Sequence, residues 1–221
     1  MVISEKPGIN FTLYLITDRK QTRAGNLRAA VEAALRGGVR AVQLREKDLS
    51  SRELLNLAGG MRELTAGYGA GLFINDRLDV AMAVEADGVH LGEESIPADR
   101  ARDVAGDRLL IGVSCHSLEK SVSARKAGAD FITFSPIFFT PSKAQYGEPQ
   151  GIERLEEVCE AVDIPVFALG GIKKDKVRTV IQRGAAGIAL ISAILAEKDP
   201  ERTAVEMLAL LKECSRQKEK G

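Results

Sequence analysis

Short apolar segments alternate with longer amphipathic segments along the chain. The apolar segments, rich in Val, Ile and Phe, cover residues 12–17, 41–45, 72–75, 88–92, 110–116, 131–136, 165–170 and 187–192. Such short, continuously apolar runs are typical of parallel strands buried on both faces. Helical periodicity is found between them, over residues 24–36, 51–67, 78–85, 98–105, 118–127, 151–161, 175–183 and 201–215. The pattern therefore predicts eight strand–helix units.

A weak internal repeat supports this organisation. Four predicted helices end in similar sequences before the next strand, at residues 36–39 (RGGV), 85–88 (EADG), 126–129 (KAGA) and 183–186 (RGAA). A glycine just past a helix relieves the left-handed conformation of the cap. Ser50 and Glu53 also fit a capping box at the start of the second helix.

The fold class that follows is α/β, a single-domain (β/α)8 TIM barrel. Eight units in 221 residues leave about 28 residues per unit, a compact form of this barrel. The domain is expected over residues 1–221, with residues 1–10 as an N-terminal extension and residues 216–221 as a tail expected to fray. A doubly wound open sheet remains the alternative, because closure is not visible in a sequence.

Composition excludes several classes of protein. Lys and Arg total 31 and Asp and Glu total 31, so the net charge of zero gives no electrostatic footprint for nucleic acid. The longest apolar run, residues 131–139, is far shorter than the ~20 residues of a membrane span, and residues 1–10 lack the apolar core of a signal peptide. Three cysteines without C-x-x-C spacing suit a reducing cytoplasm. We expect a cytoplasmic protein with small-molecule partners, and a homo-oligomer is left open.

Polar residues gather where the predicted strands end, which is where barrels of this kind carry their active sites. Gln43, Arg45 and Lys47 alternate with period two, so their side chains can share one face and form an anion clamp. The alternative is a solvated strand end with ion pairs to Glu46 or Asp48. We favour the clamp, because burying an arginine without a partner is costly.

Two further strand ends carry candidate ligands. Asn75 and Asp76 end the third strand and suit Mg²⁺, which takes one or two carboxylates plus substrate phosphate oxygens. The alternative is a turn or the N-cap of the next helix. Glu94, with its neighbour Glu93, adds charge to the same end of the barrel or simply faces solvent.

The last strands and one long loop suggest phosphate binding. Gly170, Gly171 and Ser192 follow strands seven and eight, the usual phosphate position in these barrels. The connection over residues 137–150 is long enough for a lid, and it carries Thr140, Pro141, Ser142 and Lys143. His90 is expected to be a satisfied wall residue, whereas His116 ends a strand and has a possible acid–base role.

Taken in order, these segments resemble the thiamin phosphate synthase family (thiamine-phosphate pyrophosphorylases) over residues 14–209. The matching segments are residues 43–47 (QLREK), 75–76 (ND), 86–92 (ADGVHLG), 112–114 (GVS), 140–143 (TPSK), 169–172 (LGGI) and 191–192 (IS). The resemblance implies a (β/α)8 barrel and an Mg²⁺-dependent alkyl transfer. In that reaction a hydroxymethylpyrimidine diphosphate loses pyrophosphate, and the nitrogen of a thiazole phosphate takes the resulting carbon.

The resemblance also implies roles for individual residues. Asp76 would bind Mg²⁺. The pyrimidine diphosphate is assigned to Gln43, Arg45, Lys47, Asn75, Ser114 and Lys143. The thiazole phosphate is assigned to Thr140, Ser142, Gly171, Ile191 and Ser192. The expected binding set extends to the neighbours Leu44, Glu46, Pro141 and Gly170. No protein nucleophile is required, because the aminopyrimidine can stabilise a cation once pyrophosphate leaves. Arg45, Lys47, Lys143 and Mg²⁺ would neutralise the leaving group, and Ser114 is counted with these catalytic residues.

One departure from the family keeps alternatives open. Where the family usually has a second Mg²⁺-binding aspartate, this chain has Ser95, and Glu94 is the neighbouring carboxylate that would have to replace it. Residues 95–97 (SIP) and 140–144 (TPSKA) also resemble the thiazole tautomerases, which use no metal and place a histidine at His116 as acid–base. Retention of the whole clamp favours the synthase over the tautomerase. A non-catalytic barrel that binds thiamin phosphates is the third possibility.

Overall fold

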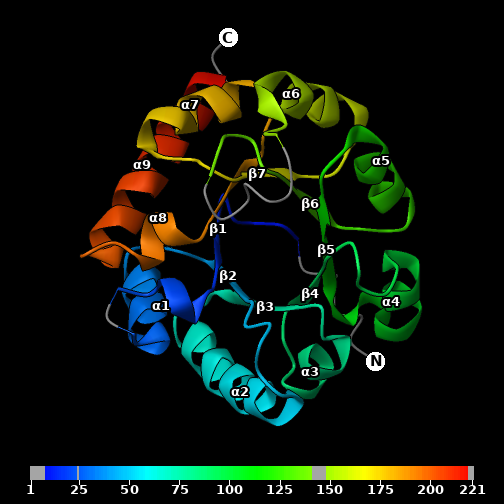
Figure 1. The fold of residues 1–221 in the computed structure, drawn as a ribbon, viewed down its shortest axis with the longest axis vertical. Coiled ribbons are helices and arrows are strands. Elements are labelled where there is room, and N and C mark those ends of the chain that lie inside the picture. Colours follow the sequence, from blue (N-terminus) through cyan, green and yellow to red (C-terminus); the bar gives the residue numbers. More distant parts are fainter. Residues whose placement is uncertain (1–7, 24, 141–147, 219–221) are drawn as a thin grey trace.

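Eight parallel strands form a closed barrel in the computed structural model, which describes residues 8–23, 25–140 and 148–218 (Figure 1). The strands are β1 (Leu13–Ile16), β2 (Ala41–Leu44), β3 (Gly71–Asn75), β4 (Gly88–Leu91), β5 (Leu110–Cys115), β6 (Phe131–Phe134), β7 (Val166–Leu169) and β8 (Gly187–Leu190). Each strand pairs with the next, and β1 pairs with β8 in the register Leu13 to Ile188. This last pairing excludes the open sheet and confirms the barrel.

Helices form a ring around the barrel (Figure 1). They are α1 (Leu27–Arg36), α2 (Ser51–Gly67), α3 (Leu78–Ala83), α4 (Ala98–Ala105), α5 (Leu118–Lys126), α6 (Gly151–Ala161), α7 (Lys174–Gln182), α8 (Ser192–Leu195) and α9 (Pro200–Lys218), with short 3-10 turns η1 (Arg19–Gln21) and η2 (Gly106–Arg108). Helix α9 reaches Lys218, so residues 216–218 of the expected tail are helical, and residues 219–221 lie outside the described chain. Helix α8 corrects the prediction that the last strand runs through Ser192, because β8 ends at Leu190.

Local sequence signals explain most helix ends. The capping box is present at α2, where the Ser50 side chain accepts from the Glu53 backbone and Glu53 accepts from the Ser50 backbone. Gly38, Gly128 and Gly184 have φ of 102°, 87° and 98° after α1, α5 and α7, as expected. At the fourth site the expectation is wrong, because Glu85 itself takes the left-handed conformation, with φ of 51°.

Gly88 is needed for packing instead. A Cβ atom on Gly88 would lie 2.5 Å from the Phe73 ring and 2.6 Å from the Leu110 carbonyl oxygen. The absence of a side chain on β4 therefore makes room for a large ring on the neighbouring strand β3.

Two apolar layers hold the barrel together. Between the strands and the helices lies a continuous core of aliphatic side chains. Inside the barrel, aromatic rings fill the end at which the strands begin: Tyr14, Phe73, Phe131 and Phe167. Phe11 comes from the segment ahead of β1 and completes this layer, with its ring centroid 5.0 Å from that of Phe167. The Phe11 ring is stacked on Phe167 and meets Phe73 and Phe131 edge to face. Aromatic pairs in both arrangements stabilise beyond the area that they bury.

Carboxylates at the start of two strands close the same end of the barrel. Asp87 accepts a hydrogen bond from the Leu72 backbone N–H at 2.7 Å and forms an ion pair with Arg62 at 2.6 Å. Asp130 repeats the arrangement one unit pair later, accepting from the Ile111 backbone at 2.7 Å and from Arg102 at 2.6 Å. The aspartates that precede β4 and β6 therefore stabilise the end of the barrel opposite to the expected site, each by a backbone hydrogen bond and an ion pair.

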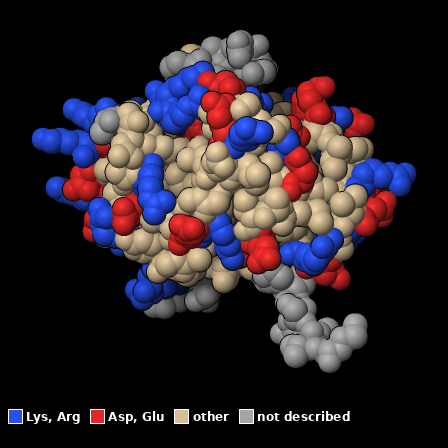
Figure 2. Space-filling model, turned by 90° about the horizontal axis from the view of Figure 1, so that it is seen from below, with Lys and Arg blue, Asp and Glu red and all other residues tan. Residues whose placement is uncertain are grey.

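The surface mixes charges of both signs, and Figure 2 shows Lys and Arg interspersed with Asp and Glu on the face viewed there. This agrees with the balanced composition. Among the described residues, no helix has the length and apolarity needed to cross a membrane.

Candidate active site

The end of β2 carries the three residues of the expected clamp. Gln43 is buried inside the barrel, Arg45 is half-buried, and Lys47 is exposed. Within the described residues, neither cationic side chain forms an ion pair, so the alternative of ion pairs to Glu46 or Asp48 does not hold there. Those carboxylates pair instead with Arg19 and Lys20. Two cations are therefore left available to an anion.

Glu46 anchors the backbone that carries these cations. Its carboxylate accepts from the Thr17 hydroxyl at 2.7 Å, from the Arg19 backbone N–H at 3.1 Å and from the Arg19 guanidinium at 3.0 Å. Thr17, which is also buried, accepts in turn from the Arg45 backbone N–H at 2.9 Å. Glu46 thus faces the loop after β1 and fixes the direction in which the β2 end leaves the barrel.

Asp76 lies at the end of β3 in a conformation that non-glycine residues seldom adopt. Its φ is 66°, and its backbone N–H donates to the His90 carbonyl oxygen at 2.9 Å. Arg77, not Asp76, is the N-cap of α3, and the cap has no side-chain hydrogen bond. The N-cap alternative is therefore wrong, but the turn is present, because the Arg77 N–H donates to the Asn75 carbonyl at 2.8 Å across Asp76. Backbone strain of this kind is found often at functional sites, and it places an exposed carboxylate next to the half-buried Asn75.

The second candidate metal position is arranged differently. The Ser95 hydroxyl accepts from the Gly92 backbone N–H at 2.7 Å, so it closes the turn after β4. Glu94 is exposed beside it. The described residues contain no cluster of three or more His, Cys, Asp or Glu side chains suited to a metal ion. The donors present fit a hard cation such as Mg²⁺ that is held by one or two carboxylates and completes its shell with substrate oxygens and water.

Ser114 and His90 meet inside the barrel on β5 and β4. His90 is 1% exposed, and its Nε2 lies 3.0 Å from Ser114 Oγ, while its Nδ1 lies 3.4 Å from the Tyr14 hydroxyl. Burial is the main reason that the pKa of His90 falls to about 3, and the nearby charge of Arg45 lowers it further. The interpretation of His90 as a satisfied wall residue is confirmed.

His116 follows β5 at the mouth. Its Nδ1 lies 2.6 Å from the Ser135 carbonyl oxygen, which can only accept, so Nδ1 carries the proton. When the ring is neutral, Nε2 therefore keeps a lone pair, which is the form that an acid–base residue would need. Cys115 beside it is buried, and burial raises the pKa of its thiol to about 11, which does not suit a nucleophile.

The ends of β7 and β8 place the expected phosphate residues next to each other in the barrel. Gly170 and Gly171 have φ of 100° and 66°, and a Cβ on Gly171 would lie 2.7 Å from the Phe139 carbonyl oxygen. The glycines thus let the segment after β6 approach closely, and the Phe138 N–H donates to the Gly170 carbonyl at 3.0 Å. Ile191 turns the chain into α8, whose first residue is the exposed Ser192.

The β6–α6 connection is described only in part. Thr140 is half-buried at the end of its described portion. Pro141, Ser142 and Lys143 lie outside the described residues, so their expected roles remain predictions.

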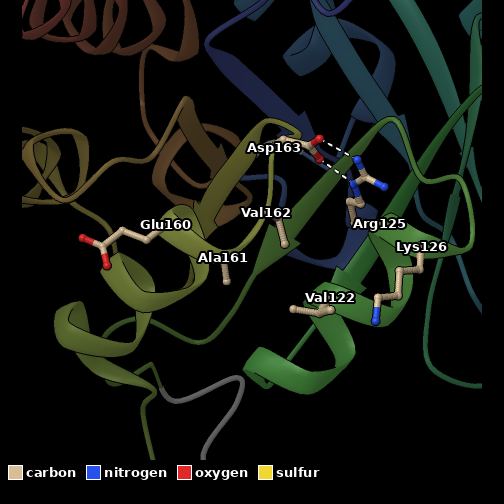
Figure 3. A pocket seen from close by; sticks show the side chains of 7 residues that line it. All are labelled: Val122, Arg125, Lys126, Glu160, Ala161, Val162 and Asp163. Carbon is tan, nitrogen blue, oxygen red and sulfur yellow. Dashed lines mark hydrogen bonds and ion pairs between the residues drawn. The ribbon is translucent and has the colours of Figure 1, made fainter.

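A surface hollow of about 550 Å³ lies elsewhere, between the ends of α5 and α6 (Figure 3). These helix ends precede β6 and β7, so the hollow is at the end of the barrel opposite to the clamp. Its Arg125 is held by both oxygens of Asp163 at 2.5 Å, as the dashed lines in Figure 3 show. The arginine is thus already neutralised, unlike Arg45.

Sequence reasoning missed four residues that organise the site. Tyr14 and Thr133 complete the hydrogen bonds of His90 and Ser114, and Thr17 and Arg19 hold Glu46. The only signal for Tyr14 and Thr133 was a single polar group on an otherwise apolar strand. Glu46, next to a cation on either side, resembled an ordinary solvated charge.

Comparison with known proteins agrees with this geometry. Residues 13–194 match the family model described as thiamine monophosphate synthase. A relative from Geobacter sulfurreducens named "Putative thiamine-phosphate synthase" is 57% identical over 92% of this chain and 95% of its own length. The thiamine-phosphate synthase of Clostridium novyi is 44% identical over 86% of this chain and 94% of its own.

A solved structure extends the comparison to three dimensions. Thiamine phosphate pyrophosphorylase from Pyrococcus furiosus superimposes with a TM-score of 0.85 at 39% identity, covering 92% of this chain and 96% of that one. The chain therefore belongs to the thiamine-phosphate synthase family and is a transferase of that family.

Proposed function

We propose that the protein joins a hydroxymethylpyrimidine diphosphate to a hydroxyethylthiazole phosphate, with Mg²⁺, to give thiamin phosphate and pyrophosphate. The observation that carries the proposal is the pair Arg45 and Lys47, which lie at the mouth with no carboxylate partner among the described residues. Half-burying a guanidinium without a counter-ion is costly unless an anion binds there. A diphosphate leaving group fits that requirement.

In this reaction the C–O bond to the diphosphate breaks, and the thiazole nitrogen forms a new C–N bond with the same carbon. The protein has to neutralise the leaving group and align the two substrates. Arg45, Lys47 and Asn75 bind the pyrimidine diphosphate, and Ser114 donates to it from the barrel floor. Glu46 acts by holding Arg45 in place, rather than by touching the substrate.

Asp76 is the residue that would hold Mg²⁺, and Glu94 would assist from the β4 loop. When bound, the ion supplies positive charge to the diphosphate oxygens. The support for this role is an exposed carboxylate that caps no helix and sits on a backbone at φ of 66°.

The thiazole phosphate would bind across the ends of β7 and β8. Gly170 and Gly171 leave the backbone accessible, and Ile191 and Ser192 form the first turn of α8. Thr140, with Ser142 and Lys143 from beyond the described segment, would close over both substrates. We also propose the cytoplasm as the compartment, since three cysteines without C-x-x-C spacing suit a reducing environment.

The test is a coupling assay with both substrates and Mg²⁺, in which thiamin phosphate is oxidised to fluorescent thiochrome. We expect product that disappears with EDTA. Asp76→Asn should lose Mg²⁺-dependent turnover, whereas the control Asp79→Asn, a few residues along and paired to Arg77, should not. Absence of product from the folded wild-type protein would overturn the proposal and direct attention to the tautomerase reaction, with His116 tested as its base.

A further inference from the structure

A continuous chain of polar side chains crosses the barrel just above the aromatic layer. Gln43 Nε2 donates to the Tyr14 hydroxyl at 3.2 Å, the hydroxyl lies 3.4 Å from His90 Nδ1, and His90 Nε2 lies 3.0 Å from Ser114 Oγ. Tyr14, Gln43 and His90 are all at most 1% exposed. The chain therefore joins two expected substrate-binding residues, Gln43 and Ser114, through two groups that substrate does not reach.

The donors and acceptors favour one direction for this series of hydrogen bonds. Gln43 Nε2 can only donate to the Tyr14 oxygen, so the acceptor for the Tyr14 proton in this series is His90 Nδ1. With Nδ1 accepting, the single N–H of the neutral imidazole is on Nε2 and is donated to Ser114. The Thr133 hydroxyl, 3.4 Å away, also donates to Ser114 Oγ.

The consequence falls on Ser114. With both lone pairs of its oxygen engaged by His90 and Thr133, its remaining hydrogen-bonding capacity is its own proton. Ser114 is half-buried on β5, so that proton is available to the mouth of the barrel. If every hydrogen bond in this series ran in the opposite direction, Ser114 would donate to His90 and present only its lone pairs to the mouth. These lone pairs would repel an anionic leaving group.

The surroundings keep the imidazole both neutral and in place. Burial lowers the pKa of His90 to about 3, so the ring carries one proton at neutral pH. The residue paired with it on β5 is Gly112, and a Cβ there would lie 2.5 Å from His90 Nδ1. Among the described residues, no buried side-chain nitrogen or oxygen lacks a hydrogen-bond partner, so this layer is fully bonded.

We propose that His90 is a positioning residue that, together with Tyr14, holds Ser114 as a hydrogen-bond donor to the pyrimidine diphosphate. The proposal rests on the function proposed above. His90 acts through Ser114 and does not itself touch the substrate.

The first test reads the tautomer directly, without activity. The chain has two histidines, so ¹⁵N-labelled imidazoles of the whole protein give two ring systems, which His116→Gln assigns. We expect His90 to carry its proton on Nε2 at pH 7.5 and His116 to carry its proton on Nδ1. A proton on Nδ1 of His90 would overturn the proposal.

The second test is a double-mutant cycle. We expect roughly tenfold losses in kcat/KM for Ser114→Ala and for His90→Phe, about what one hydrogen bond contributes. The double variant should be no worse than Ser114→Ala, because His90 then has nothing to position. His90→Gln, whose amide can still donate to Ser114, should recover part of the activity, and Tyr14→Phe should reproduce part of the loss.

The outcomes separate the two proposals. Additive losses in the cycle, with matching decreases in thermal stability, would make His90 a purely structural residue and overturn the inference, while wild-type synthesis would leave the function intact. No synthesis by the wild-type protein would remove the function, whatever the tautomer of His90.

Discussion

The buried carboxylate of Glu46 gives the sharpest test of how the site is held. Glu46→Gln keeps the shape of the side chain but replaces one carboxylate oxygen by an amide NH₂. Three donors converge on this carboxylate: the Thr17 hydroxyl, the Arg19 backbone and the Arg19 guanidinium. An amide can accept through only one atom, so at least one charge-assisted bond is lost and a donor faces a donor.

The magnitude follows from burial. The Glu46 side chain is 2% exposed and that of Arg19 is 33% exposed, so the bond is only partly screened by water. A charge-assisted hydrogen bond contributes about 1.5–3 kcal/mol, and we expect a loss of about 2–3 kcal/mol in the free energy of unfolding. For a chain of this size that lowers Tm by roughly 5–10 °C. Urea denaturation, with the midpoint and slope fitted separately, measures the loss.

Asp48→Asn is the matched control, because Asp48 pairs with the same arginine but its side chain is 45% exposed. Exposed pairs contribute less than about 1 kcal/mol. Losses for the two variants that agree within about 0.5 kcal/mol would refute the reasoning that burial gives Glu46 its weight. We also expect Glu46→Gln to weaken inhibition by pyrophosphate, since Thr17 links Glu46 to the Arg45 backbone.

Three further predictions concern titration, metal and thiols. His90 has a pKa of about 6.5 in the unfolded chain and about 3 in the folded chain, so the unfolded chain binds more protons between these values. The free energy of unfolding should therefore fall below pH 6.5 by up to about 1.4 kcal/mol per pH unit. His90→Phe should flatten this slope between pH 6.5 and 5, as measured by urea titrations. Ser95→Asp should lower the Mg²⁺ concentration needed for half-maximal synthesis, because an aspartate can keep the Gly92 hydrogen bond and add charge to the mouth; an unchanged Mg²⁺ curve would contradict it. At pH 8, alkylation followed by mass spectrometry should label half-buried Cys159 before Cys115, whose thiol pKa is about 11.

The strands could be predicted because each buried strand has a nearly unbroken apolar sequence. Predicted and observed bounds differ by at most two residues at either end, and the two largest differences are at the ends of β6 and β8. The apolar pattern predicts a last strand through Ser192, because apolar residues continue into α8. Ile191 has φ of −118° and ψ of −93°, so the chain turns there for a reason that no local pattern encodes.

The site was predictable where it depends on residue type and spacing, and less so where it depends on long-range pairing. Gln43 and Arg45 interrupt an apolar strand, and their period of two indicated a shared face. The partners of Glu46 come from a loop 27 residues earlier in the chain, so its burial had no signal in its own segment. The polar layer inside the barrel depends on a contact between Tyr14 and His90, which are 76 residues apart in the sequence. Only the closed barrel brings these two residues together.

The two ends of the barrel use similar residues for opposite purposes. Where the strands begin, Asp87 and Asp130 each receive a strand N–H and an arginine, so charge is satisfied within the chain and contributes to stability. Where the strands end, Glu46 is satisfied in the same way, yet Arg45 beside it has no such partner among the described residues. Each of the other partly buried arginines in the described part of the chain pairs with a carboxylate. Arg45 is left to an anion from outside, so the chain gives up stability at the position where we propose that the diphosphate binds.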